Sequence, residues 1–191
     1  MVKWSSPKAG KRWYNRSYTI SRRSMRPIAM GLHTEMYSAF ARGNVNALKA
    51  KCTEGIFESF RARIAGRKKG EVLKWELLKY NGSPKVVADR GALIPGMDGM
   101  AIRQAVVRIA SKQRLTKEVG GKVVEGSEKS KDVLEYVVVQ QKVHRWQVEG
   151  WKLWGTTKES TLEDVEEWKR RALSGHMTPL RSPDILTIDA I

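Results

Sequence analysis

The side chains with the clearest capacity for chemistry in this sequence are cations that occur in a tight group. Arg61, Arg63, Arg67, Lys68 and Lys69 lie within nine residues, in the segment RARIAGRKKG. Cations at the end of a helix compensate its dipole and keep the surface soluble, which is one interpretation of this group. Five cations exceed what a dipole requires, so we favour contact with phosphate groups. We expect all five to be exposed and to contribute little to stability.

A second group of cations lies on segment 101–119, AIRQAVVRIASKQRLTKEV. Its odd positions form an apolar row with the two-residue period of a strand, whereas Arg108, Lys112 and Arg114 occupy even positions. A strand needs the apolar row for packing, but it does not need the cations. We therefore predict that the apolar row packs beneath helices and that the basic row faces RNA phosphate or anionic lipid. Composition alone does not separate these two partners.

The N-terminal segment 1–34 carries eight basic side chains and no acidic one. Aromatic rings occur between its arginines, a combination that suits RNA because rings stack on bases while guanidinium groups hold phosphates. The candidate RNA contacts here are Arg12, Trp13, Tyr14, Arg16, Arg22 and Arg23. A solvated, disordered tail is the other interpretation. The composition also fits an organelle transit peptide, but Pro27 and Gly31 would interrupt the amphipathic helix that such a peptide forms.

The totals agree with a polyanionic partner. The chain has 191 residues, with 36 Lys and Arg against 20 Asp and Glu, and a net charge of +16. Such a balance attracts nucleic acid or an anionic membrane surface. No segment approaches the roughly 20 apolar residues that cross a bilayer, so membrane contact would be peripheral. The single cysteine, Cys52, excludes an internal disulfide, and its place on an apolar helix stripe predicts a buried structural thiol.

Residues suited to catalysis or metal binding do not form a recognisable pattern. The three histidines, His33, His144 and His176, are isolated, and no nucleophile, phosphate-loop or dinucleotide motif occurs. Tyr80, Asp89 and His144 could in principle meet in the hollow of a sheet, but three such residues arise by chance in most proteins. We therefore expect no catalytic residue, no metal ligand and no cofactor, and we expect that the protein is not an enzyme.

Hydrophobic periodicity predicts three short helices between residues 35 and 66. We expect Asn44 to cap the second helix and Thr53 to cap the third. We expect strands at 72–80, 85–94, 101–119, 132–146 and 147–157. A last helix is expected at 160–173. Helices followed by strands without βαβ alternation indicate an α+β fold, with helices on one face of a curved antiparallel sheet. We predict one domain, 35–173, between the basic extended tail 1–34 and an irregular tail, 174–191.

Three segments, AIRQAVVRIASKQRL, KDVLEYVVVQQKV and WQVEGWKLW, occur in an order and spacing that resemble a mitochondrial ribosomal family. This family is the large-subunit protein numbered forty-five, and its fungal relatives include the inner-membrane ribosome receptor. The resemblance covers roughly residues 35–157. It implies a cone-shaped α+β domain, shared with nuclear transport factor two and with the C-terminal domain of an import-motor subunit.

The resemblance also implies a function. Such a protein would be a structural component of the mitochondrial large ribosomal subunit near the polypeptide exit, in the matrix. It would bind ribosomal RNA and neighbouring ribosomal proteins, and it would help to tether the ribosome to the inner membrane and its insertase. No small-molecule substrate is implied. The alternative is a peripheral import-motor or chaperone subunit with the same fold that does not bind the ribosome.

Overall fold

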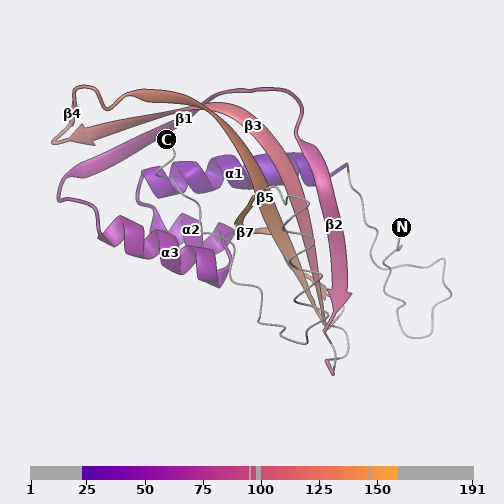
Figure 1. Ribbon diagram of the computed structural model, residues 1–191. Helices are drawn as coiled ribbons and strands as arrows, with labels where there is room; N and C mark the ends of the chain where they lie inside the picture. The colour runs from indigo at the N-terminus through magenta and orange to yellow at the C-terminus, as the bar shows by residue number, and fades with distance from the viewer. Residues whose placement is uncertain (1–22, 95, 98–99, 146, 159–191) are drawn as a thin grey trace, which may run out of the picture.

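The described part of the chain forms three helices and a seven-stranded antiparallel sheet. The computed structural model describes residues 23–94, 96–97, 100–145 and 147–158. The helices are α1 (Met25–Ala41), α2 (Val45–Lys51) and α3 (Glu54–Ala65). The strands are β1 (Glu71–Tyr80), β2 (Lys85–Leu93), β3 (Ala101–Val119), β4 (Lys122–Val123), β5 (Lys129–His144), β6 (Gln147–Val148) and β7 (Lys152–Thr157). Figure 1 shows a long, bent sheet with the helices on its concave side.

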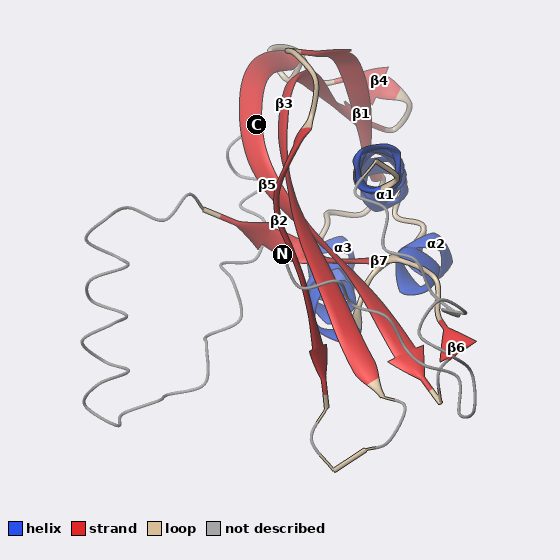
Figure 2. Ribbon diagram, turned by 90° about the vertical axis from the view of Figure 1, so that its right-hand side faces the viewer, coloured by secondary structure: helices blue, strands red, loops and turns tan. Residues whose placement is uncertain are grey.

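The strand β3 is the centre of the sheet. Along one edge it pairs with β2 and then with β1, and along the other it pairs with β5 over residues 101–115 and with the short β4. The pairing register shifts in β1 and in β2, and such irregularities bend a strand. The sheet can therefore curve around the helices, as Figures 1 and 2 show.

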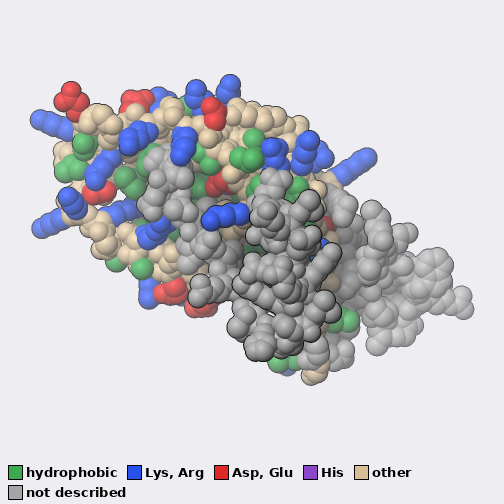
Figure 3. Space-filling view, in the orientation of Figure 1, with side chains coloured by type: hydrophobic (Ala, Val, Ile, Leu, Met, Phe, Trp, Pro, Cys, Tyr) green, Lys and Arg blue, Asp and Glu red, His purple; other side chains and the backbone are tan. Residues whose placement is uncertain are grey.

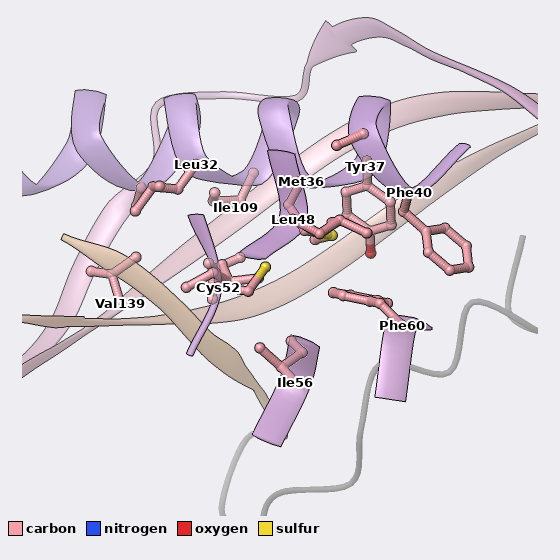
Figure 4. Close-up of a cluster of buried hydrophobic side chains, with 14 of the residues drawn as sticks. Leu32, Met36, Tyr37, Phe40, Leu48, Cys52, Ile56, Phe60, Ile109 and Val139 are labelled. Atoms are coloured by element: carbon pink, nitrogen blue, oxygen red, sulfur yellow. The ribbon is translucent and has the colours of Figure 1, made fainter. Parts of the chain in front are cut away.

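The core lies between the concave face of the sheet and all three helices. On β3 the odd positions from Ala101 to Gln113 are buried and the even positions are half-exposed, so the predicted two faces of this strand are confirmed. In Figure 4, apolar side chains of the three helices meet Ile109 of β3 and Val139 of β5. The α+β architecture with helices on one face of an antiparallel sheet is therefore confirmed, whereas the cone of nuclear transport factor two stays a prediction.

The first helix begins well before the expected boundary of the domain. The prediction that residues 1–34 form an extended tail is wrong for residues 25–34, because these form the first half of α1. Pro27 lies in the first turn, where a helix leaves its N–H groups without intrahelical acceptors, so the ring is tolerated. Gly31 costs about 1 kcal/mol in a helix interior. Burial of Met25, Ala29 and Leu32 offsets that cost.

The other boundaries follow the sequence more closely. The Asn44 side chain accepts a hydrogen bond from the N–H of Ala47 at 3.0 Å, which confirms the predicted cap of α2. Thr53 precedes α3 but makes no side-chain capping bond. Cys52 is buried, and burial raises the pKa of its thiol to about 12, so the predicted structural thiol is confirmed. The segments 160–173 and 174–191 lie outside the described residues.

Candidate polyanion-binding surface

The part of the chain between residues 23 and 158 carries most of the positive charge. Between residues 23 and 158 the sequence has 26 Lys and Arg against 13 Asp and Glu, a net charge of +13. Six carboxylates of the described residues pair with Lys or Arg: Glu35, Glu58, Glu71, Glu76, Asp89 and Glu128. Figure 3 shows the resulting surface, with Lys and Arg side chains gathered around the end where β4 lies. The excess of cations is therefore a property of the domain and not only of a tail.

Two of the three predicted cations on β3 lack an ion pair, although Asp132 lies directly opposite Lys112 in the β3–β5 register. Arg108 and Lys112 lie at even positions, on the sheet face opposite the helices, and both are half-exposed. Within the described residues no ion pair joins either side chain to a carboxylate. A cation without an acidic partner is free to approach a phosphate oxygen, so these two residues suit the predicted role.

Arg114, the third predicted cation on this face, is already occupied by carboxylates. Its guanidinium donates to Glu76 at 2.9 Å and to Glu128 at 2.8 Å. The hydrogen bond to Glu128 is the main cause that raises the pKa of Arg114 above its ordinary value. Glu76 lies directly opposite Arg114 in the β1–β3 register, which the sequence alone did not reveal. A phosphate contact at Arg114 would have to compete with these two partners.

The cluster at the end of α3 separates into structural and exposed members. Arg67 donates to the carbonyl oxygens of Phe40 at 2.8 Å and of Ala41 at 2.9 Å, and its guanidinium lies 4.6 Å from the centre of the Phe40 ring. These carbonyls end α1, where four C=O groups lack intrahelical donors. Burial lowers the pKa of Arg67, although nearby Glu71 raises it. The expectation that all five cations are exposed is therefore wrong for Arg67, which caps α1.

Lys68 and Lys69 are the exposed cations of this cluster that no described carboxylate pairs with. They lie in the turn between α3 and β1, which ends at Gly70 with a φ of +78°. The N–H of Gly120 donates to the carbonyl of Gly70 at 3.4 Å, so this turn lies beside the β3–β4 hairpin. Arg61 is also exposed but pairs with Glu58 on the same helix at 2.7 Å. Arg63, in the last turn of α3, is only half-exposed, so the expected exposure is wrong for this residue as well.

The predicted RNA contacts of the N-terminal tail are mostly outside the described residues. Arg12, Trp13, Tyr14, Arg16 and Arg22 all precede residue 23. Arg23 is described, and it is exposed in the turn directly before α1. It adds one more cation to the described surface, and the role of the tail stays a prediction.

A buried polar cluster, which sequence reasoning missed, joins α1 to the sheet. The Nε2 atom of His33 lies 2.8 Å from Glu135, and the Tyr37 hydroxyl donates to the other oxygen of the same carboxylate. Gln113 also donates to Glu135 at 2.9 Å and accepts from the Trp75 indole at 2.9 Å. The signal in the sequence was the polar residues at inward-facing positions of two otherwise apolar strands. His33, treated above as isolated, therefore lies in a network.

The charge state of this cluster follows from its contacts. Burial raises the pKa of Glu135, but hydrogen bonds from His33, Tyr37 and Gln113 outweigh burial and leave that pKa below its ordinary value. Burial and the neighbouring carboxylate raise the pKa of Tyr37 well above its ordinary value. His33 has no exposed surface and Glu135 has 9%, so solvent hardly reaches the cluster. Its evident role is to fix α1 on β3 and β5.

The three residues weighed for catalysis do not come together. Tyr80 pairs with Ser111, and Asp89 pairs with Ala105, six residues away on β3. At 3.3 Å per residue this is a separation of about 20 Å. His144 is exposed at the end of β5, beyond the β3 residues that pair with Tyr80 and Asp89. Among the described residues no group of three His, Cys, Asp or Glu is placed to hold a metal ion.

Asp89 instead forms a buried ion pair that the sequence did not indicate. Its carboxylate accepts two hydrogen bonds from Arg103, at 2.7 and 2.9 Å, and both side chains are almost fully buried. The Arg103 guanidinium also lies 5.1 Å from the centre of the Trp151 ring. Arg103 occupies an odd position of β3 and so belongs to the inner face. It is a structural cation rather than a candidate contact for an external anion.

The structure contains no helix, among its described residues, that is long and apolar enough to span a bilayer.

The chain resembles an inner membrane mitoribosome receptor, MBA1, of Saccharomyces cerevisiae, with 28% identity over 109 residues. This match covers 57% of the present chain but only 38% of the yeast protein. A solved structure of the intermembrane space region of the chloroplast protein ARC6 shows 11% identity and a TM-score of 0.46, and it covers 75% of this chain and 100% of that one.

A protein-family model carries the assignment. The model described as MBA1-like protein matches residues 19–174, which include every helix and strand described above. The part of the predicted resemblance that concerned the fungal ribosome receptors is thereby confirmed, whereas membership of the large-subunit protein forty-five family stays a prediction. The match begins before α1, in agreement with the corrected boundary of the domain. The chain belongs to the MBA1-like protein family.

Proposed function

We propose that this protein is a non-enzymatic tether that binds the mitochondrial ribosome and holds it at the inner membrane. The yeast relative is named as an inner membrane mitoribosome receptor, and the present chain shares its family. The observation that carries the proposal for this chain is the set of cations without carboxylate partners, above all Lys68, Lys69, Arg108 and Lys112. A domain with a net charge of +13 and such a surface suits ribosomal RNA and anionic lipid.

The RNA contact would be made through the phosphate backbone. Lys68 and Lys69 project from a turn and carry ammonium groups, which bind phosphates as point charges without reading base sequence. The basic tail, with Arg12, Trp13 and Arg16, would add stacking on bases. Recognition of shape and backbone is sufficient for a protein that meets one fixed site on a large ribonucleoprotein. We place that site near the polypeptide exit, on the matrix side, where neighbouring ribosomal proteins and the insertase would also be contacted.

The experiment that tests this proposal is co-sedimentation with purified mitochondrial large ribosomal subunits. The full chain should sediment with the subunits in near-stoichiometric amount at physiological salt and should be released as salt increases, because phosphate contacts are screened. The matched variant replaces Lys68 and Lys69 by glutamine and should be released at lower salt. A chain that stays in the supernatant at physiological salt would contradict the tether and would favour the import-motor or chaperone alternative.

A further inference from the structure

One end of the sheet carries exposed apolar side chains that the core does not use. A cross-strand row runs through Leu93, Ala101, Val143 and Val148, which are paired neighbours on β2, β3, β5 and β6. The two inner members are buried, but Leu93 is 57% exposed and Val148 is 42% exposed. Met97, in the β2–β3 loop beside this row, is 53% exposed. Figures 1 and 2 show that the strands run past the helices at this end.

Cations lie at the same end of the sheet, two of them on its opposite face, since Arg90 pairs with Gln104 and Lys142 with Ile102, at even positions of β3. Arg90, Lys142 and Arg145 are exposed on the neighbouring positions of β2, β5 and the β5–β6 turn. The segments 90–102 and 142–150 hold two carboxylates in the sequence, Asp98 and Glu149, of which Glu149 is among the described residues. Exposed apolar side chains with cations at the same end of a sheet match the boundary between lipid headgroups and acyl chains, because the apolar side chains can enter the hydrocarbon while the cations meet phosphates. RNA is bound through cations and aromatic rings, and it offers no such place for Leu, Met and Val.

We infer that this end of the sheet, defined by Leu93, Met97 and Val148 with Arg90, Lys142 and Arg145 and here named the apolar tip, inserts into an anionic lipid bilayer. The inference rests on the proposed tether and identifies which of its surfaces faces the membrane. Lys68 and Lys69 lie beside the β3–β4 hairpin, at the opposite end of β3. The 18 residue steps of that strand correspond to about 60 Å of extended chain. The two ends can therefore contact two different partners at once.

The test measures binding of the full chain to vesicles of phosphatidylcholine with about one-fifth anionic phospholipid, a fraction chosen to give a negative surface potential. One variant replaces Leu93, Met97 and Val148 by serine. The matched control replaces three valines at the opposite end that are similarly exposed, at 50%, 46% and 57%: Val72, Val119 and Val123. All six side chains are about half-exposed, so each triple variant is expected to fold, and thermal melting checks this.

The tip variant should bind vesicles about tenfold more weakly or worse, because it loses the apolar contacts with the acyl chains. The remaining binding should disappear at high salt, whereas part of the wild-type binding should persist, since insertion is not screened. The control variant should bind as the wild type does. Equal binding by all three proteins would overturn the inference, and so would equal losses in the two variants.

A second measurement locates the inserted residue directly. Cys52 is buried and its thiol has a pKa of about 12, so a cysteine introduced elsewhere reacts selectively at neutral pH. A polarity-sensitive fluorophore attached to the Met97→Cys variant should shift to the blue on addition of vesicles, and one attached to Val123→Cys should not. A shift at position 123 alone would place the membrane at the opposite end.

Ribosome co-sedimentation of the same variants separates this inference from the proposed function. The tip variant should still sediment with large subunits, because its change lies far from Lys68 and Lys69. Loss of ribosome binding in the tip variant alone would show that the apolar tip contacts the ribosome, and it would overturn the inference. Failure of the wild type to bind ribosomes, with vesicle binding intact and dependent on the tip, would refute the tether and leave the membrane surface in place.

Discussion

Replacing Arg67 by glutamine is expected to destabilise the fold, although the sequence groups this residue with candidate phosphate contacts. The Arg67 guanidinium holds two carbonyl oxygens at the end of α1 and covers the Phe40 ring. Glutamine is too short to reach both carbonyls, and its neutral amide does not replace the cation over the ring. The matched control is Arg61→Gln, which makes the same chemical change at an arginine whose side chain is 60% exposed.

The magnitude follows from these contacts. A hydrogen bond to a charged donor contributes about 1.5 kcal/mol or more, and a cation over an aromatic ring adds about 0.5–1 kcal/mol. Because Arg67 is partly exposed, the loss of stability comes to about 2–3 kcal/mol, which for a domain of this size lowers the Tm by about 4–12 °C. Arg61 loses only a helical pair with Glu58. That pair is worth about 0.3–0.5 kcal/mol, or roughly 1–2 °C.

The assay is thermal unfolding followed by circular dichroism, combined with a salt titration of RNA binding. Arg67→Gln should lower the Tm and leave the salt dependence of RNA binding nearly unchanged at temperatures where it is folded. A variant with Lys68 and Lys69 replaced by glutamine should show the opposite pattern, with a slope of log K against log salt reduced by about 1–2. Equal and small Tm changes for Arg67→Gln and Arg61→Gln would refute the assignment of Arg67 as a cap of α1.

Further predictions concern the sheet, the buried carboxylate and the thiol. Val107→Asp should unfold the domain, because it buries a charge without a partner. The double variant with Arg108→Ser and Lys112→Ser should instead leave the Tm nearly unchanged and weaken polyanion binding. Equal destabilisation by both changes would show that the two faces of β3 are misassigned. The pKa of Glu135 is lower in the fold than in the unfolded chain, so its contribution to stability is complete above its ordinary pKa, about 4.3, and is lost as the pH falls through the folded value. The free energy of unfolding, measured in urea, should therefore fall more steeply with decreasing pH in this acidic range for the wild type than for Glu135→Gln. Cys52 should resist thiol reagents at neutral pH until the protein is denatured, and rapid modification of the native protein would contradict its burial.

Local patterns predicted those features of the fold that depend on neighbours in sequence. The alternation along β3 identified its buried and basic faces, because the side-chain period of a strand is two. The Asn44 cap was readable for the same reason, since its partner lies three residues away. The predicted start of α1 is too late, because Pro27 and Gly31 indicate a helix break unless their positions in the helix are known. Only the packing of Met25 and Ala29 in the core shows that the helix extends so far.

Features that depend on contacts distant in sequence were not predictable in this way. His33 and Glu135 are 102 residues apart, and their meeting depends on how α1 crosses the sheet. Arg67 reaches back 27 residues to Phe40, so a local count of cations assigned it to the surface. Arg114 faces Glu76 only because of the β1–β3 register. In each case a charge that looked free in the sequence has a partner in the fold.

The measurement that tests the central claim most directly is flotation of ribosomes with vesicles. Purified mitochondrial large subunits, vesicles that contain anionic phospholipid and the full chain are placed at the bottom of a density gradient at physiological salt. A tether predicts that the subunits float with the vesicles only when the chain is present, and that fewer subunits float when Lys68 and Lys69 are both replaced by glutamine. Subunits that remain at the bottom while the wild-type chain itself floats would contradict the account, because the chain would then bind the membrane without holding the ribosome there.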